Sequence, residues 1–338
     1  MRGAMSVTEL FKSENTADEI ELQFDASGRL KHLLTLRGLD RSLITELLDR
    51  SEKFLSPMGQ PVVRSTALQG RTVANLFFEP STRTRASFDL AARRMGADVL
   101  NLDVKTSARK KGESILDTLY TLQAMQVDIF VIRDASAGVP AYIARLVGPH
   151  ASILNAGESD VSHPTQGLLD LLTIRRHKGD FGELVVAIVG DIAHSRVARS
   201  AAEGLKTMGV GELRLISPEA LAPDPDAFPS ARIMHNLDDG IRGADVVMAL
   251  RIQRERIGSL DGIPGIDEYY KNFGVSSARM QNAAPDAIVM HPGPMNRGIE
   301  IESSLADSSQ SVITEQVTNG VAVRMALLAT VAKTLGSQ

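Results

Sequence analysis

The sequence contains no cysteine among its 338 residues. This absence excludes disulfide bonds, thiolate zinc sites, thiol nucleophiles and cysteine-ligated iron–sulfur clusters. The sequence also has no apolar run near the ~20 residues that a membrane-spanning helix needs. The first residues carry no signal-peptide core, so we expect a cytoplasmic protein.

The sequence also has no excess of positive charge. It contains 37 Lys and Arg residues and 41 Asp and Glu residues, which gives a net charge of −4. This balance excludes a general nucleic-acid-binding surface but leaves room for local basic pockets. Neither GxxxxGK[ST] nor GxGxxG occurs, which argues against nucleotide hydrolysis and a dinucleotide fingerprint. The seven histidines show no metal-ligand spacing such as HExxH, so we expect neither a metal nor a cofactor.

Short apolar segments alternate with helical patterns along most of the chain. The predicted strands are 73–78, 129–133, 152–155, 185–189, 213–216, 233–235, 245–250 and 287–291. Helical spacing predicts helices over 33–55, with Asp40 as a candidate N-cap, and over 88–95, 164–177, 197–208 and 321–335. Strands and helices that alternate in this way are typical of parallel sheets flanked by helices.

A polar, glycine-bearing stretch at 177–182 separates two halves of this pattern. We expect two doubly wound α/β domains with parallel sheets, over 31–177 and 182–315, with the active site in the cleft between them. Residues 1–30 are predicted to form a loosely ordered N-terminal extension. A C-terminal helix within 316–338 is expected to pack back on the first domain.

The most informative stretch runs from Asn75 to Arg85. A strand is expected to end at Phe78, and Pro80 discourages its continuation. A helix then starts within a run of hydroxyl and arginine side chains, where free backbone N–H groups and guanidinium forks favour a phosphate. Helix capping explains one such hydroxyl but not the alternation. The candidate anion ligands are Ser81, Thr82, Arg83 and Thr84.

This stretch resembles the phosphate-binding signature of the aspartate/ornithine carbamoyltransferase family, and other segments resemble the family's motifs in the same order. These segments are Ile132-Arg133, Asn155–Gly157, His163–Gln166, Ile188–Asp191 with His194–Arg196, and His291–Pro294. The resemblance covers residues 70–300 and implies transfer of a carbamoyl group from carbamoyl phosphate to an amine.

Three features resemble the aspartate branch of the family. Residues 107–113 resemble its mobile loop, and residues 250–256 resemble its aspartate-binding segment. The motif His-Pro-Gly-Pro stands where ornithine enzymes carry His-Cys-Leu-Pro. Gly293 replaces the leucine of many relatives, at a position expected to act through its backbone carbonyl. The resemblance therefore implies formation of N-carbamoyl-L-aspartate and phosphate, the committed step of pyrimidine biosynthesis.

The resemblance also implies a role for each matching residue. Arg133 would bridge the phosphate and the carbonyl oxygen, and His163 would donate to that oxygen, so Thr84, Arg133 and His163 are the catalytic candidates. The side chain of Gln166 and two backbone carbonyls would accept from the carbamoyl NH2. The expected carbamoyl phosphate ligands are Ser81, Thr82, Arg83, Thr84, Arg133, His163, Gln166, Gly293 and Pro294.

The expected aspartate ligands are Lys111, Arg196, Arg251 and Gln253, and two of them have alternative interpretations. Arg251 could pair with Glu255 four residues later, and Lys110 with Lys111 could form a solvated charge run. By resemblance, Ser107 and Lys111 reach a neighbouring subunit's site, which implies a homotrimer.

Other functions and partners stay open at this point. The acceptor could be another amine such as ornithine, or the chain could be a catalytically silent, anion-binding homologue. A dihydroorotase-like or regulatory chain could join it in a larger assembly, because residues 5–35 resemble the extension of relatives that form one.

Overall fold

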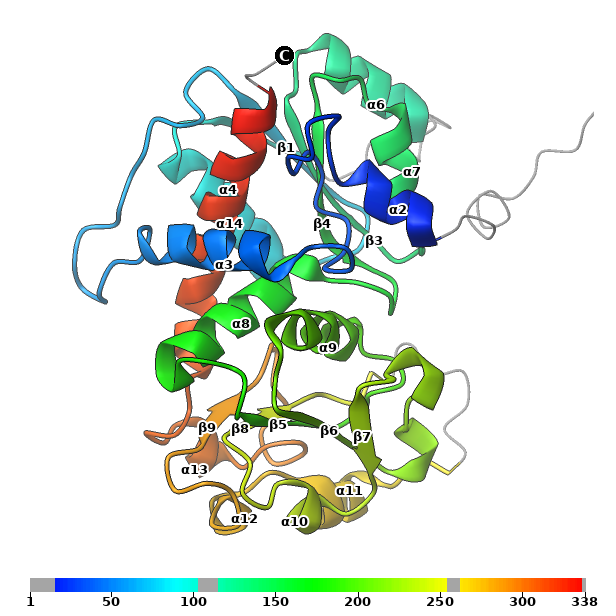
Figure 1. Cartoon of the computed structure of the whole chain (residues 1–338), viewed down its shortest axis with the longest axis vertical. Helices are drawn as coiled ribbons and strands as arrows, with labels where there is room; N and C mark the ends of the chain where they lie inside the picture. Colours follow the sequence, from blue (N-terminus) through cyan, green and yellow to red (C-terminus); the bar gives the residue numbers. More distant parts are fainter. Residues whose placement is uncertain (1–15, 103–114, 254–261, 336–338) are drawn as a thin grey trace, which may run out of the picture. The chain divides into compact units, whose positions relative to one another are not determined.

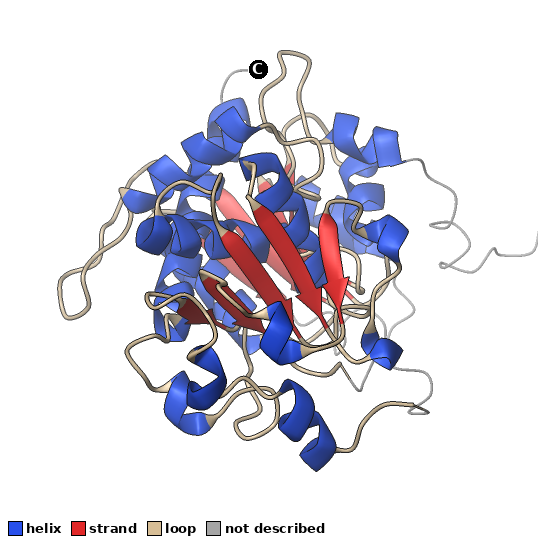
Figure 2. Cartoon of the chain, turned by 60° about the horizontal axis from the view of Figure 1, so that its bottom comes forward, coloured by secondary structure: helices blue, strands red, loops and turns tan. Residues whose placement is uncertain are grey.

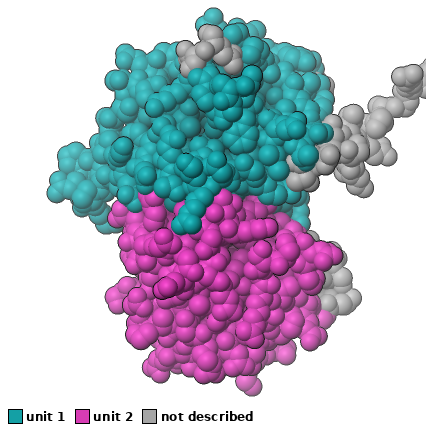
Figure 3. Space-filling view, viewed as in Figure 1, with its two compact units in different colours: residues 1–165, 320–338 teal, residues 166–319 magenta. Residues whose placement is uncertain are grey.

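The structure is a computed structural model that describes residues 16–102, 115–253 and 262–335. The chain divides into two compact units, residues 1–165 with 320–338 and residues 166–319, which Figure 3 colours teal and magenta. In sequence, both divisions fall inside helices, namely α8 (Pro164–Lys178) and α14 (Ile313–Leu335). No helix in the described ranges has the length and apolar content needed to cross a membrane.

Unit 1 contains a parallel sheet with the strand order β2-β1-β3-β4. Helices lie on both sides of this sheet, with α6 and α7 on one side and α4 on the other (Figure 1). The strands are β1 (Thr72–Phe77), β2 (Asp98–Leu102), β3 (Ile129–Asp134) and β4 (Ser152–Glu158). The helices besides α8 and α14 are α2 (Thr16–Leu22), α3 (Arg41–Glu52), α4 (Thr82–Arg94), α6 (Ile115–Ala124) and α7 (Val139–Leu146).

Unit 2 contains a second parallel sheet, with the order β7-β6-β5-β8-β9. The strands are β5 (Val185–Val189), β6 (Glu212–Ile216), β7 (Ala231–Met234), β8 (Val246–Ala249) and β9 (Ile288–Met290), drawn in red in Figure 2. The helices are α9 (Arg196–Met208), α10 (Leu237–Gly240), α11 (Ile266–Phe273), α12 (Ser277–Met280) and α13 (Ser303–Ala306), with short 3₁₀ turns at Glu219–Leu221 and Pro225–Ala227.

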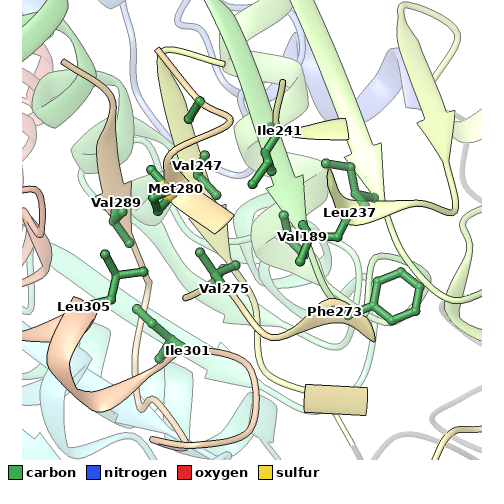
Figure 4. Close-up of a cluster of buried hydrophobic side chains, with 14 of the residues drawn as sticks. Val189, Leu237, Ile241, Val247, Phe273, Val275, Met280, Val289, Ile301 and Leu305 are labelled. Carbon is green, nitrogen blue, oxygen red and sulfur yellow. The ribbon is translucent and has the colours of Figure 1, made fainter. Parts of the chain in front are cut away.

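An apolar layer holds helices α10, α11, α12 and α13 against the sheet of unit 2. Val189 and Val247 on the strands pack with Leu237, Phe273 and other buried side chains (Figure 4). Because each side chain leaves water completely or nearly so, this layer contributes a large favourable free energy to the folding of the unit. Both units are therefore α/β layers with parallel sheets, which confirms the predicted fold class.

Every strand predicted from the sequence is present, and one further strand was not predicted. β2 lies at the edge of its sheet, and Asp98 and Asn101 on it are exposed. A half-exposed edge strand lacks the continuous apolar run that identifies the buried strands. The last helix also begins earlier than predicted, at Ile313.

The predicted helix over 33–55 is only partly correct. Asp40 caps α3 as predicted, because its carboxylate accepts from the backbone N–H of Leu43 at 2.7 Å. Leu33 instead forms a parallel bridge to Leu154 of β4, and its N–H donates to the carbonyl of Ile153. Leu33 therefore lies beside β4 at the edge of the sheet, and the buried apolar side chains of Leu33, Leu34 and Leu36 are not part of a helix.

The prediction of a loosely ordered extension is wrong for residues 16–30. These residues form α2 and a turn closed by a bridge between Phe24 and Leu30. The side chain of Gln23 is fully buried, and its Oε1 accepts from the N–H groups of Leu34 and Thr35. One polar side chain thus anchors this segment, which a search for apolar periodicity does not detect.

His32 is a second buried polar anchor near the same segment. Its Nδ1 accepts from the backbone N–H of Ile153 at 2.9 Å, so the ring must be neutral at that nitrogen. Burial, and secondarily the charge of Lys31, lowers the pKa of His32 to about 3.

This pKa predicts that acid destabilises the protein through His32. The unfolded chain takes up a proton near its ordinary pKa of 6.5, whereas the folded chain does so only near 3, so stability falls as pH drops between these values. From pH 7 to pH 5 the loss is about 2 kcal/mol. In His32→Asn, which keeps an acceptor for Ile153, urea unfolding should show a loss smaller by that amount. An equal loss in both proteins would contradict this role.

Candidate active site

The turn between β1 and α4 places the predicted phosphate ligands at a helix start. α4 begins at Thr82, within the predicted interval, and Ser81 is its N-cap residue in an extended conformation. The Ser81 hydroxyl makes no capping hydrogen bond, so it does not satisfy the first N–H groups of the helix. Thr82 and Arg83 are exposed, and Thr84 is buried. This combination of amides, hydroxyls and a guanidinium has the chemistry of an anion site.

Arg133 lies beside this turn, since it pairs with Phe77 in the register between β3 and β1. Its backbone carbonyl accepts from the N–H groups of Phe78 and Glu79, at 2.8 and 3.3 Å. Its guanidinium donates to the Glu79 carboxylate at 2.9 Å and to the carbonyl of Ala156 at 3.2 Å. Because the Arg133 side chain is buried and paired with the partly buried Glu79 carboxylate, these contacts orient its guanidinium.

The start of α8 carries the predicted His163 and Gln166. His163 is buried and directly precedes Pro164, the first helical residue. The Nε2 of Gln166 donates to the Oδ1 of Asp170 at 3.0 Å, one turn further along the helix. Because a carboxylate only accepts, this contact orients the amide and makes its Oε1 available as an acceptor.

In unit 2, the fully buried Asp191 joins the loops that follow the neighbouring strands β5 and β8. Its Oδ1 accepts from His194, both from the backbone N–H at 3.2 Å and from Nδ1 at 2.9 Å. Its Oδ2 accepts from the backbone N–H of Gln253 at 2.9 Å. Gly190 permits this approach, because a Cβ there would lie 2.3 Å from the carbonyl oxygen of Leu250.

The two predicted carboxylate-binding arginines follow these same strands. Arg196 is the buried first residue of α9, which Ser195 caps by accepting from the N–H of Ala198. Arg251 follows β8, and its Nη2 donates to the Oε1 of Gln253 at 3.2 Å. Ligands of parallel sheets bind outside the carboxyl ends of the strands, which is where both arginines lie. Glu255, the alternative partner of Arg251, lies outside the described residues.

The loop after β9 carries the predicted Gly293 and Pro294, whose peptide bond is cis. The Nδ1 of His291 accepts from the N–H of Gly293 at 2.8 Å, and its Nε2 donates to Glu300 at 3.0 Å. The same Glu300 oxygen accepts from the backbone N–H of Asn296. This buried carboxylate therefore holds the loop from within, as Asp191 does for the neighbouring loops.

Tyr269 on α11 lies close enough to both of these carboxylates to be affected by them. Burial, and then the negative charges of Glu300 and Asp191, raise the pKa of its hydroxyl. The phenol therefore stays neutral across the physiological pH range.

The structure distributes the predicted residues between the two units. The unit 1 set is Ser81, Thr82, Arg83, Thr84, Arg133 and His163, and the unit 2 set is Gln166, Arg196, Arg251, Gln253, Gly293 and Pro294. Ser107 and Lys111 lie outside the described residues. Within the described ranges, no group of three or more His, Cys, Asp or Glu side chains could hold a metal ion.

Sequence reasoning assigned no role to the carboxylates that support these residues. They are Glu79, Asp170, Asp191 and Glu300. The sequence did contain an indication for Asp191. A carboxylate directly after a buried strand and a glycine is costly in free energy unless its oxygens accept hydrogen bonds. The partners of the other three depend on the fold.

Comparison with known proteins gives this arrangement a family. The model of the carbamoyl-P binding domain of aspartate/ornithine carbamoyltransferases matches residues 31–176, and that of their Asp/Orn binding domain matches residues 182–331. The chain belongs to the aspartate/ornithine carbamoyltransferase family. The resemblance inferred from the sequence motifs is therefore confirmed.

Solved structures from both branches of the family are similar to this carbamoyltransferase. Aspartate transcarbamoylase from Trypanosoma cruzi, in complex with carbamoyl phosphate and aspartate, is 30% identical with a TM-score of 0.80, over 92% of this chain and 99% of that chain. Ornithine carbamoyltransferase from Thermus thermophilus is 25% identical with a TM-score of 0.78, over 89% and 98%. That from Pyrococcus furiosus is 27% identical with a TM-score of 0.78, over 91% and 98%. The site residues must therefore indicate the acceptor amine.

Proposed function

We propose that this carbamoyltransferase transfers the carbamoyl group of carbamoyl phosphate to the amine of L-aspartate. The products are N-carbamoyl-L-aspartate and phosphate, and the reaction is the committed step of pyrimidine biosynthesis. The observation that carries the choice of aspartate is the pair of arginines, Arg196 and Arg251, after neighbouring strands of unit 2. Aspartate offers each guanidinium a carboxylate, whereas ornithine has one carboxylate and two amines.

Two further observations support the aspartate branch. The late motif of this chain reads His291-Pro292-Gly293-Pro294 and has no cysteine, unlike the motif of the ornithine enzymes. The Trypanosoma cruzi aspartate transcarbamoylase, which is similar over 92% of this chain, was crystallised with carbamoyl phosphate and aspartate.

Unit 1 is proposed to bind the phosphate and to polarise the carbonyl. The start of α4 supplies backbone N–H groups, the hydroxyls of Ser81, Thr82 and Thr84, and the Arg83 guanidinium. Arg133 contacts the phosphate and the carbonyl oxygen, and its contacts with Glu79 and Ala156 hold it in place beforehand. A donor held in this way stabilises developing negative charge without reorganisation.

The chemical step then needs no covalent nucleophile from the protein. The neutral amine of aspartate attacks the carbonyl carbon, and negative charge develops on the carbonyl oxygen, to which Arg133 and His163 donate. The bond from the carbonyl carbon to the phosphate oxygen breaks, and the departing phosphate accepts the proton that the amine loses. Acceleration comes from holding the two substrates in position and from stabilising the oxyanion.

The carbamoyl NH2 is bound by acceptors alone. They are the Oε1 of Gln166 and the backbone carbonyls of Gly293 and Pro294. The contact between Gln166 and Asp170 directs the amide nitrogen away from this task, which supports the assignment of Oε1 as the acceptor.

If Arg251 binds aspartate, an Arg251→Ala substitution should affect the KM values of the two substrates differently. Its KM for aspartate should rise about 10–100-fold, because a hydrogen bond to a charged group contributes about 1.5–3 kcal/mol. Its KM for carbamoyl phosphate should not change. Steady-state kinetics measure both constants, and Arg242→Ala, an exposed arginine paired with Asp239, is the matched control.

The same assay with ornithine in place of aspartate decides between the alternatives. Wild-type turnover with aspartate and none with ornithine is expected. Faster turnover with ornithine would overturn the choice of acceptor, and no phosphate release with either amine would indicate a silent homologue.

We also propose a homotrimer in which Ser107 and Lys111 complete a neighbouring subunit's site, on the resemblance of residues 107–113 to the family's mobile loop. Arg83→Ala and Lys111→Ala proteins should each be nearly inactive, because each lacks one component of every site. Dissociation and reassembly of a mixture should restore activity, because some sites then combine an intact Arg83 with an intact Lys111. Reassembled Arg83→Ala protein alone is the control. Absence of recovery in the mixture would contradict shared sites.

A further inference from the structure

A continuous chain of hydrogen bonds in unit 2 links two of the residues whose acceptors we assign to the carbamoyl NH2, Gln166 and Gly293. Its first part joins α8 to α14. The Oδ1 of Asp170 accepts from the Nε2 of Gln166 at 3.0 Å and from the Nε2 of Gln316 at 2.8 Å. The Oε1 of Gln316 in turn accepts from the backbone N–H of His291 at 2.9 Å.

The second part runs through the loop after β9. The Nδ1 of His291 accepts from the N–H of Gly293, and its Nε2 donates to Glu300, at 2.8 and 3.0 Å. Asp170, Gln316, His291 and Glu300 are all at most 2% exposed, so water does not compete for these contacts. The chain thus connects the Gln166 side chain to the backbone of Gly293 without a break.

The direction of every hydrogen bond in this chain is determined. Asp170 can only accept, so both glutamines must turn their NH2 groups toward it, and Gln316 must then present its Oε1 to His291. The N–H of Gly293 requires an unprotonated Nδ1, which places the ring proton on Nε2, facing Glu300. Reversing any one residue would set a donor against a donor or an acceptor against an acceptor, which is costly inside the protein, so the hydrogen bonds favour this one arrangement.

We propose that Gln316 and His291 are positioning residues that set the Gln166 and Gly293–Pro294 acceptors at the spacing a carbamoyl NH2 requires. The proposal rests on the proposed function, which assigns these acceptors to carbamoyl phosphate. The consequence is discrimination against acyl phosphates that carry a methyl group in place of NH2. A methyl group would leave these acceptors without donors, among them the buried side chain of Gln166, and a site built for hydrogen bonding rejects such an analogue strongly.

The test compares binding of carbamoyl phosphate and acetyl phosphate by calorimetric titration of the whole chain. Wild type should bind carbamoyl phosphate more tightly. Gln316→Met keeps the length of the side chain but removes both of its hydrogen bonds. Its affinity for carbamoyl phosphate should fall about tenfold, as expected for losing one or two hydrogen bonds. Its affinity for acetyl phosphate should be unchanged.

Asn319→Leu is the matched control for helix packing. Asn319 also lies on α14 and donates to Thr173 of α8 at 2.8 Å, so it joins the same two helices outside the network. This variant should keep the wild-type ratio of the two affinities. If both variants lower both affinities equally, the role of Gln316 is structural and the proposal fails.

A pair of His291 variants tests the other part of the chain and decides the matter if Gln316→Met does not fold. His291→Asn keeps an acceptor near the position of Nδ1 for the Gly293 N–H, whereas His291→Gln moves it away. The ratio of the affinity for carbamoyl phosphate to that for acetyl phosphate should be retained in His291→Asn and lowered in His291→Gln. Equal ratios in the two variants would overturn the proposal. A wild type that does not prefer carbamoyl phosphate would instead contradict the proposed function.

Discussion

Hydrogen bonds from loop amides to buried carboxylates hold the loops at the edge of unit 2 where we propose that aspartate and the carbamoyl group bind. Asp191 holds the loops after β5 and β8, and Glu300 holds the loop after β9. A buried carboxylate is costly without donors, and a loop amide out of water is costly without an acceptor. Each supplies a partner that the other needs, and this favours the loop arrangement seen in the substrate-free chain. Arg251, Gln253 and Gly293 depend on this constraint for their places.

In unit 1, a buried cation holds a turn in place. Arg133 fixes the turn with its backbone carbonyl and is itself fixed by Glu79 and Ala156. In both units a buried charged group that forms hydrogen bonds with a loop helps to determine where that loop lies. Catalysis of carbamoyl transfer requires this kind of order, because donors that are already in place stabilise an oxyanion at no cost in reorganisation.

Local patterns predicted the parts of this molecule that depend on neighbours in sequence. Buried strands gave apolar runs, Asp40 gave a helix cap, and the hydroxyl and arginine run after Pro80 marked the start of α4. Long-range polar contacts left no such pattern. Gln316 meets Asp170 across 146 residues, and Gln23 satisfies backbone groups of a distant segment, so only the folded chain identifies their partners. The edge strand β2 was not predicted because it is partly exposed and therefore lacks a continuous apolar run.

Hydrogen exchange of single loop amides in the substrate-free chain tests this constraint most directly. The amides of Gln253 and Asn296 donate to the buried carboxylates Asp191 and Glu300. We expect both amides to be strongly protected, and an Asp191→Ala substitution should remove protection from Gln253 while leaving Asn296 protected. Exchange of these amides at the rate of an unstructured peptide in the wild-type protein would contradict the account.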